Sequence, residues 1–126
     1  MSKTQENLMA AFAGESQANR KYLAFADVAD KEGLPQVAKL FRAAAAAETI
    51  HAHAHLKYAG KIGDTLANLK SAIEGETYEF TKMYPDMIKD AQAEGNTTVA
   101  KYFDFANKVE EDSFQGIFVN QRDVFG

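Results

Sequence analysis

The feature that most constrains the fold is an internal repeat, which divides the chain into two similar halves. Glu32-Gly33, followed by the string VAKLF, recurs 62 positions later as Glu94-Gly95, followed by VAKYF. Glu15 and Glu76 stand in the similar strings AGES and EGET, 61 positions apart. Such a repeat predicts two units of common ancestry, whose equivalent residues face each other about a pseudo-twofold axis.

Each half has the pattern of two long helices. Turn residues fall at 33–35, at 60–64 and at Gly95-Asn96, and the segments between them carry apolar residues at steps of three and four. No segment alternates in the manner of a strand. We therefore predict an all-α four-helix bundle, formed by one domain over residues 1–126. The predicted helices cover residues 4–31, 35–59, 65–94 and 97–120.

Composition excludes several classes of function. The net charge is only -4 and the basic residues are scattered, so the chain shows no signal for nucleic acid or a membrane surface. The N-terminus lacks the apolar run of a signal peptide and no stretch approaches the ~20 apolar residues of a membrane span, so we expect a cytoplasmic protein. The chain has no cysteine. Redox chemistry must therefore use oxygen and nitrogen ligands or a bound cofactor.

An acidic residue lies on the apolar stripe of every predicted helix, near its middle. The first and third helices place Glu15 and Glu76 there, and the second and fourth place Glu48 and Glu110. A single acid of this kind is satisfied by a neighbouring hydroxyl or lysine. Four carboxylates at the same level of a bundle cannot share a dry core unless cations balance their charges. No lysine or arginine lies on these stripes to do so. The sequence therefore predicts divalent metal ions.

The spacing of these residues fits a site for two metals. Di-iron carboxylate bundles take one Glu from each of two helices and a Glu-x-x-His pair from each of the other two. Glu48 and His51 form one such pair. After Glu110 the repeat demands histidine at position 113, but Ser113 stands there, and serine is a poor ligand that leaves room for water. We expect one firm metal site and one looser site, with His55 a polar neighbour.

The chain resembles the rubrerythrins over essentially its whole length. The strings that carry the resemblance are AFAGESQANRKYLAFA, AETIHAHAHL, GKIGDTLANLKSAIEGETYEFTKMYP and EGNTTVAKYF. The resemblance implies a ferritin-like domain that holds two iron ions, with manganese or zinc as substitutes. It implies the following ligands: Glu15 and Glu76 at the ends of the centre, and Glu48 and Glu110 as bridges between the metals.

The resemblance also assigns further residues to this centre. In rubrerythrins one iron moves between a histidine and an extra glutamate as the redox state changes, and these residues match His51 and Glu79. Two tyrosines that bond the carboxylates match Tyr22 and Tyr84. Ser113 departs from the family pattern at the second metal.

The function implied by the resemblance is peroxidase activity in protection against oxidative stress. Hydrogen peroxide would be reduced to water, with electrons from a separate rubredoxin-like donor, because the chain ends without the four-cysteine domain that rubrerythrins typically carry. Two alternatives stay open. The protein is a ferroxidase or iron-handling protein that consumes dioxygen, or it is a metal-binding bundle whose site is impaired by Ser113.

The short connection between the second and third helices bears on assembly. Residues 60–65 span at most ~3.3–3.6 Å each, whereas a helix of ~25 residues is nearly ~40 Å long. The connection cannot return along the bundle, so either the topology is plain up-down-up-down or hairpins are exchanged in a domain-swapped homodimer. We expect the swapped homodimer. In it one chain contributes Glu15, Glu48 and His51, and the other contributes Glu76, Glu79 and Glu110.

Overall fold

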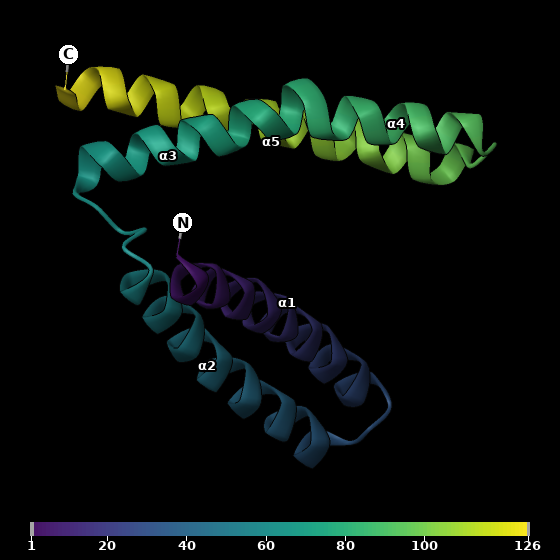
Figure 1. The fold of residues 1–126 in the computed structure, drawn as a ribbon. Helices are drawn as coiled ribbons and strands as arrows, with labels where there is room; N and C mark the ends of the chain where they lie inside the picture. Colours follow the sequence, from purple (N-terminus) through teal and green to yellow (C-terminus); the bar gives the residue numbers. More distant parts are fainter. Residues whose placement is uncertain (1, 126) are drawn as a thin grey trace. The chain divides into compact units, whose positions relative to one another are not determined.

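A computed structural model describes the backbone of residues 2–125 and the side chains of residues 2–119. This part of the chain contains helices and no strand, which confirms the all-α prediction (Figure 1). The chain divides into two units at the boundary between Ile62 and Gly63. The elements are α1 (Lys3–Lys31), α2 (Pro35–Tyr58), α3 (Thr65–Tyr78), the π-helix η1 (Glu79–Met83), α4 (Tyr84–Ala93) and α5 (Thr97–Phe125).

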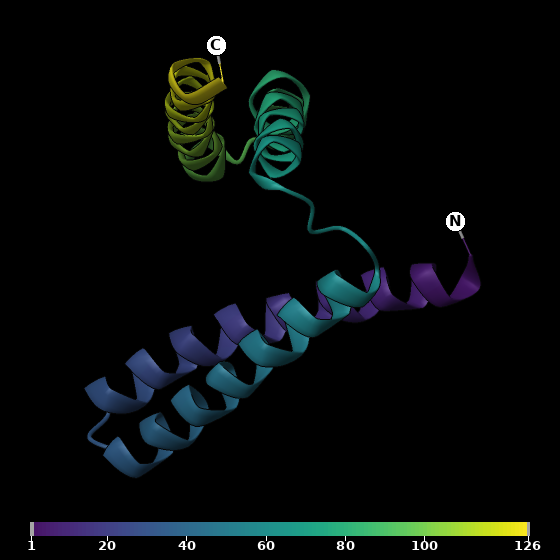
Figure 2. The ribbon, with the colours of Figure 1, turned by 90° about the vertical axis from the view of Figure 1, so that its left-hand side faces the viewer.

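The first unit is a hairpin in which α1 and α2 lie side by side (Figures 1 and 2). Ser2 caps the start of α1, because its hydroxyl accepts a hydrogen bond from the N–H of Gln5 at 3.1 Å. The turn passes through Gly33 at a φ of 75°, a conformation that only glycine adopts without strain. Pro35 then begins α2, where its missing N–H has no cost. The predicted ends of both helices are correct to within one residue.

The second unit is a hairpin in which α5 packs along α3, η1 and α4 (Figures 1 and 2). Asp64 caps α3, because its carboxylate accepts a hydrogen bond from the N–H of Ala67 at 2.8 Å. The prediction of one regular helix over 65–94 is wrong in one respect. A π-helical turn interrupts it, in which the N–H of Tyr84 donates to the carbonyl of Glu79, five residues back. The last helix also extends to Phe125, beyond the predicted end at 120.

The π-helical turn accounts for the change in the repeat offset. The offset is 61 positions between Glu15 and Glu76, but 62 between Tyr22 and Tyr84. The second hairpin therefore holds one extra residue in this interval, and η1 lies within the same interval. A π-helical turn absorbs one extra residue without breaking the helix. The residues before and after it consequently stay in phase with their equivalents in α1.

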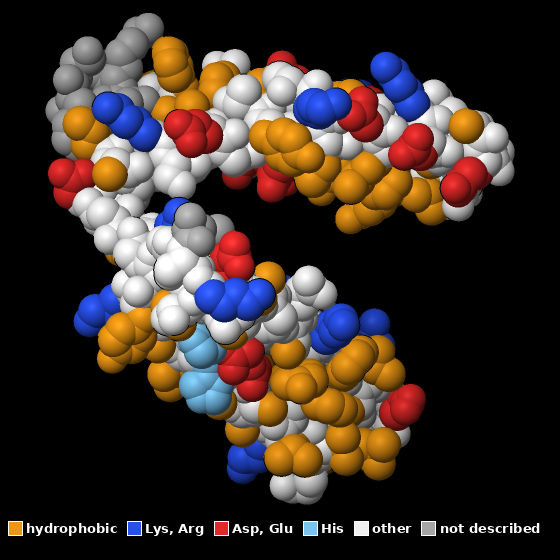
Figure 3. Space-filling model, in the orientation of Figure 1, with side chains coloured by type: hydrophobic (Ala, Val, Ile, Leu, Met, Phe, Trp, Pro, Cys, Tyr) orange, Lys and Arg blue, Asp and Glu red, His pale blue; other side chains and the backbone are white. Residues whose placement is uncertain are grey.

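Alanine side chains form the buried core of both hairpins. Two helices cannot enclose a large side chain, and among the described residues no large side chain is completely buried. Larger apolar residues lie on open faces instead, as Leu40 does at 70% exposure and Phe105 at 67%. Figure 3 shows such side chains gathered over parts of each hairpin. The buried alanines are Ala26, Ala29, Ala38, Ala45, Ala52 and Ala59 in the first unit, and Ala91 and Ala100 in the second.

None of the helices in the described part of the chain is both long enough and apolar enough to cross a membrane.

Candidate metal centre

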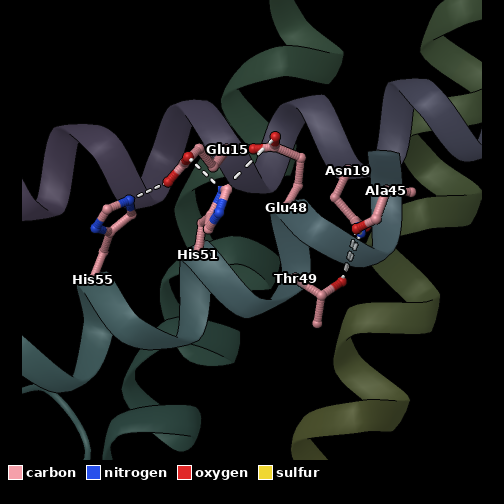
Figure 4. Close-up of polar contacts among 7 residues, drawn as sticks. All are labelled: Glu15, Asn19, Ala45, Glu48, Thr49, His51 and His55. Carbon is pink, nitrogen blue, oxygen red and sulfur yellow. Dashed lines mark hydrogen bonds and ion pairs between the residues drawn. The ribbon is translucent and has the colours of Figure 1, made fainter. Parts of the chain in front are cut away.

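The first hairpin brings three of the predicted ligands together (Figure 4). Glu15 projects from α1, while Glu48 and His51 project from adjacent turns of α2. One ligand atom from each residue lies within 4.8 Å of the other two. Nδ1 of His51 is 3.2 Å from Oε1 of Glu15 and 4.0 Å from Oε1 of Glu48. Two carboxylates and an imidazole at these distances form a donor set that suits iron, manganese or zinc.

A second histidine lies beside this group. His55 lies one helical turn after His51, and its Nε2 contacts Oε2 of Glu15 (Figure 4). Each oxygen of the Glu15 carboxylate therefore faces an imidazole nitrogen. His55 is outside the group whose ligand atoms all lie within 4.8 Å of one another, in keeping with the expectation that it is a neighbour of the ligands.

The second hairpin brings together the other three predicted ligands, all of them carboxylates. Glu76 comes from α3, Glu79 from the first position of η1 and Glu110 from α5, and their ligand oxygens lie within 4.8 Å of one another. Oε2 of Glu76 is buried and has no hydrogen-bond partner among the residues that the structure describes. A buried carboxylate oxygen without a donor is costly. A divalent cation satisfies such an oxygen and offsets the repulsion among the three acids, so the residues present fit a metal ion.

The closeness of these three carboxylates changes their pKa values. A hydrogen bond with Glu110, followed by burial and the charges of Glu110 and Glu79, raises the pKa of Glu76 to about 7. The hydrogen bond with Glu110, followed by burial, also raises the pKa of Glu79. Hydrogen bonds from Glu76 and Glu79 lower the pKa of Glu110. Without a metal, the group therefore retains a proton near neutral pH that a bound cation would displace.

We expect metal binding to this group to release a proton in a pH-dependent way. Because the pKa of Glu76 is raised to about 7, its carboxyl is mostly protonated at pH 6 and mostly ionised at pH 8. Binding of Zn(II) should release about one more proton at pH 6 than at pH 8, and should be weaker at pH 6. Calorimetry in two buffers of different ionisation enthalpy counts these protons. The Glu76→Gln variant should lose the difference, and equal proton release by the native protein at both pH values would contradict the expectation.

The two predicted tyrosines occupy equivalent places in the hairpins. Tyr22 stacks on Phe41 with ring centroids 6.1 Å apart, and Tyr84 packs on Phe103 at 6.0 Å. Burial, followed by the charge of Glu110, raises the pKa of the Tyr84 phenol. Among the described residues neither phenol makes a hydrogen bond to a predicted ligand, so the carboxylate bonding of the tyrosines stays a prediction.

Comparison with known proteins agrees with this arrangement. The rubrerythrin family model matches residues 6–112. The chain belongs to the rubrerythrin family. Rubrerythrin of Porphyromonas gingivalis is 40% identical over 124 residues, which cover 88% of this chain and 62% of that protein. Nigerythrin of Nitratidesulfovibrio vulgaris is 43% identical over 123 residues, which cover 85% of this chain and 60% of that protein.

A solved structure supports the same assignment for this rubrerythrin. The structure of nigerythrin in its fully reduced, all-ferrous state matches with a TM-score of 0.50 and 35% identity, over 98% of this chain and 68% of that chain. The predicted all-α, ferritin-like class is thus confirmed, and membership of the family implies a di-iron centre. The chain spans about three fifths of the length of the P. gingivalis rubrerythrin and of nigerythrin.

Proposed function

We propose that this rubrerythrin reduces hydrogen peroxide to water at a two-iron centre to which both ligand groups contribute. The observation that supports this most is that each hairpin gathers three donors, which leave coordination positions of a divalent ion open for a small substrate. One group consists of Glu15, Glu48 and His51, and the other of Glu76, Glu79 and Glu110. The metals are iron, and a separate rubredoxin-like protein returns the electrons after each turnover.

A bound di-iron centre would supply the two electrons that reduce the O–O bond of peroxide, and two protons would complete the two water molecules. The chain's own residues hold the ions and deliver protons. Glu15 and Glu76 would each hold one ion, and Glu48 and Glu110 would be shared by both ions. His51 and Glu79 would be the two alternative ligands of one ion. A carboxylate of this group, or a water molecule bound at the site, would donate the protons.

Stopped-flow oxidation of the ferrous protein tests this function. Protein loaded anaerobically with Fe(II) is mixed with stoichiometric peroxide or with dioxygen, and the ferric absorption is followed. We expect peroxide to react faster. Faster reaction with dioxygen would favour a ferroxidase, and bound iron that reacts with neither oxidant would mean that the site is impaired.

Replacing Ser113 by histidine should tighten metal binding in the second hairpin. Ser113 is half-buried, one turn beyond Glu110, at the position equivalent to His51. Restoring the missing imidazole supplies a strong nitrogen donor, and we expect the affinity of that group for Zn(II) to rise by at least ~10–100-fold. Competition with a chelator measures the change. Ser71→His places the same imidazole at an exposed position of α3 and should have no effect. Equal affinities of native and Ser113→His protein would contradict this role of the position.

We also propose that two chains exchange hairpins to complete two such centres. Only six residues separate α2 from α3, and both hairpins carry exposed apolar side chains that need cover. Light scattering should give a mass of about 28 kDa, twice the 13.9 kDa of the chain. Insertion of ~15 Gly/Ser residues after Ile62 should shift the protein toward the monomer, because the longer connection can span a bundle. A native monomer with full metal content would contradict the exchange.

A further inference from the structure

We propose that His55 is a positioning residue of the metal centre, which fixes the orientation of the Glu15 carboxylate. The proposal rests on the proposed two-metal centre. Nε2 of His55 contacts Oε2 of Glu15, while Oε1 of Glu15 lies 3.2 Å from Nδ1 of His51 (Figure 4). The carboxylate is therefore held at one oxygen by His55 and presents the other oxygen to the ligand group.

The surroundings of this contact favour a fixed geometry. Oε2 of Glu15 is buried, and the side chains of Glu15 and His55 are only 29% and 28% exposed. Among the described residues this oxygen accepts no regular hydrogen bond, and Nε2 of His55, which contacts it as an ion-pair partner, is the nitrogen placed to act as its donor. By contrast, the side chain of His51 is 53% exposed. His51 is thus the more mobile of these two ligands. The Glu15 carboxylate lies between two imidazoles, and its contact with His55 restricts its rotation.

His55 orients a ligand and is not itself a ligand. The ligand atoms of Glu15, Glu48 and His51 all lie within 4.8 Å of one another, and His55 is outside this group. Residues that hydrogen-bond to a metal ligand restrict its rotation and keep its free oxygen aimed at the ion. Removal of such a partner typically lowers metal affinity by ~10–100-fold.

The repeat indicates that a supporting histidine of this kind occurs only in the first hairpin. At the offset of 62 positions, His51 is matched by Ser113 and His55 by Ile117. The second hairpin therefore has an imidazole at neither equivalent position. The metal group of the first hairpin has a ligand histidine and a supporting histidine, while that of the second is made of carboxylates. Loss of His55 should consequently weaken one metal position and leave the other unchanged.

The test is Co(II) binding by the full-length protein, measured by competition with a chelator and by the visible absorption of the bound ion. His55→Ala should weaken the tighter class of sites by ~10–100-fold and change its absorption spectrum, while the second class keeps its affinity. His55→Gln, whose amide nitrogen can also donate to Oε2 of Glu15, should bind within about threefold of the native protein. The matched control is His53→Ala, since His53 is an exposed histidine on the same helix.

A double-mutant cycle shows whether His55 acts through Glu15. In a Glu15→Gln background, the additional change His55→Ala should cost little further affinity, because the carboxylate that it orients is gone. Additive losses would overturn the proposal, and so would a His55→Ala protein with native affinity and spectrum. If His55→Ala loses its helical circular dichroism, the glutamine variant decides: native-like affinity supports the role, and lost affinity in a folded protein overturns it. A native protein that binds no Co(II) would overturn the metal centre and this role with it.

Discussion

Replacing Glu79 by alanine should slow the oxidation of the ferrous protein by peroxide about 10²–10⁴-fold, the range for loss of a group that handles protons in the reaction. Glu79 is half-buried, opens the π-helical turn and belongs to the carboxylate group with Glu76 and Glu110. The repeat does not require it, because its equivalent in α1 is Ala18. π-helical turns occur frequently at functional sites, so we expect Glu79 to act in the reaction and not in folding.

The rate should fall while the iron stays bound, since Glu15, Glu48 and His51 remain for the ion that Glu79 would bind, and Glu76 and Glu110 remain for the other. Stopped-flow traces are therefore compared at equal iron content, determined for each preparation. Glu74→Ala is the matched control, because Glu74 is an exposed acid on α3. It should react at the native rate. A Glu79→Ala protein that reacts as fast as the control would remove Glu79 from the mechanism.

Metal loading should raise the free energy of unfolding by about 5 kcal/mol, at a free metal concentration about 100 times the dissociation constant of each of two sites. Each bound ion contributes about 2.7 kcal/mol under these conditions, provided that the unfolded chain does not bind it. The effect is large for this chain, because the described core of each hairpin consists of alanines and its carboxylates repel one another when no cation is bound. Metal binding thus stabilises a fold with a small apolar core.

Urea titrations with excess Zn(II) and with a chelator measure this difference. The double variant Glu15→Gln, Glu76→Gln keeps similar side-chain volumes but removes one ligand from each group, and it should lose most of the metal-dependent stabilisation. Unfolding midpoints of the native protein that coincide with and without metal would show that neither group binds an ion tightly.

The helices could be predicted from the sequence because their ends are marked by local chemistry. Gly33 and Gly95 take positive φ angles of 75° and 74° in the turns of the two hairpins, and Pro35 and Asp64 mark helix starts. The π-helical turn was missed, because apolar periodicity over residues 65–94 is satisfied by a regular helix. Its signal was the change of the repeat offset from 61 to 62 positions between Glu76 and Tyr84.

The candidate ligands could be predicted because helical spacing decides which side chains share a face. Glu48 and His51 lie three residues apart, and the structure places both beside Glu15. The contact between His55 and Glu15 depends on side-chain rotamers across two helices, which periodicity does not specify. The raised pKa of Glu76 likewise depends on the burial of one oxygen and on its distance from Glu110, and these properties exist only in the folded hairpin.

The most direct test of the account is to locate the iron by anomalous diffraction from crystals of the iron-loaded protein. We expect two irons about 3.5–4 Å apart, as in two-metal sites, one bound by Glu15 and the other by Glu76, with Glu48 and Glu110 as bridges. Each pair should draw ligands from a first hairpin and a second hairpin. Irons that are bound singly, each by one hairpin alone, or an absence of iron at both groups, would contradict the two-metal centre.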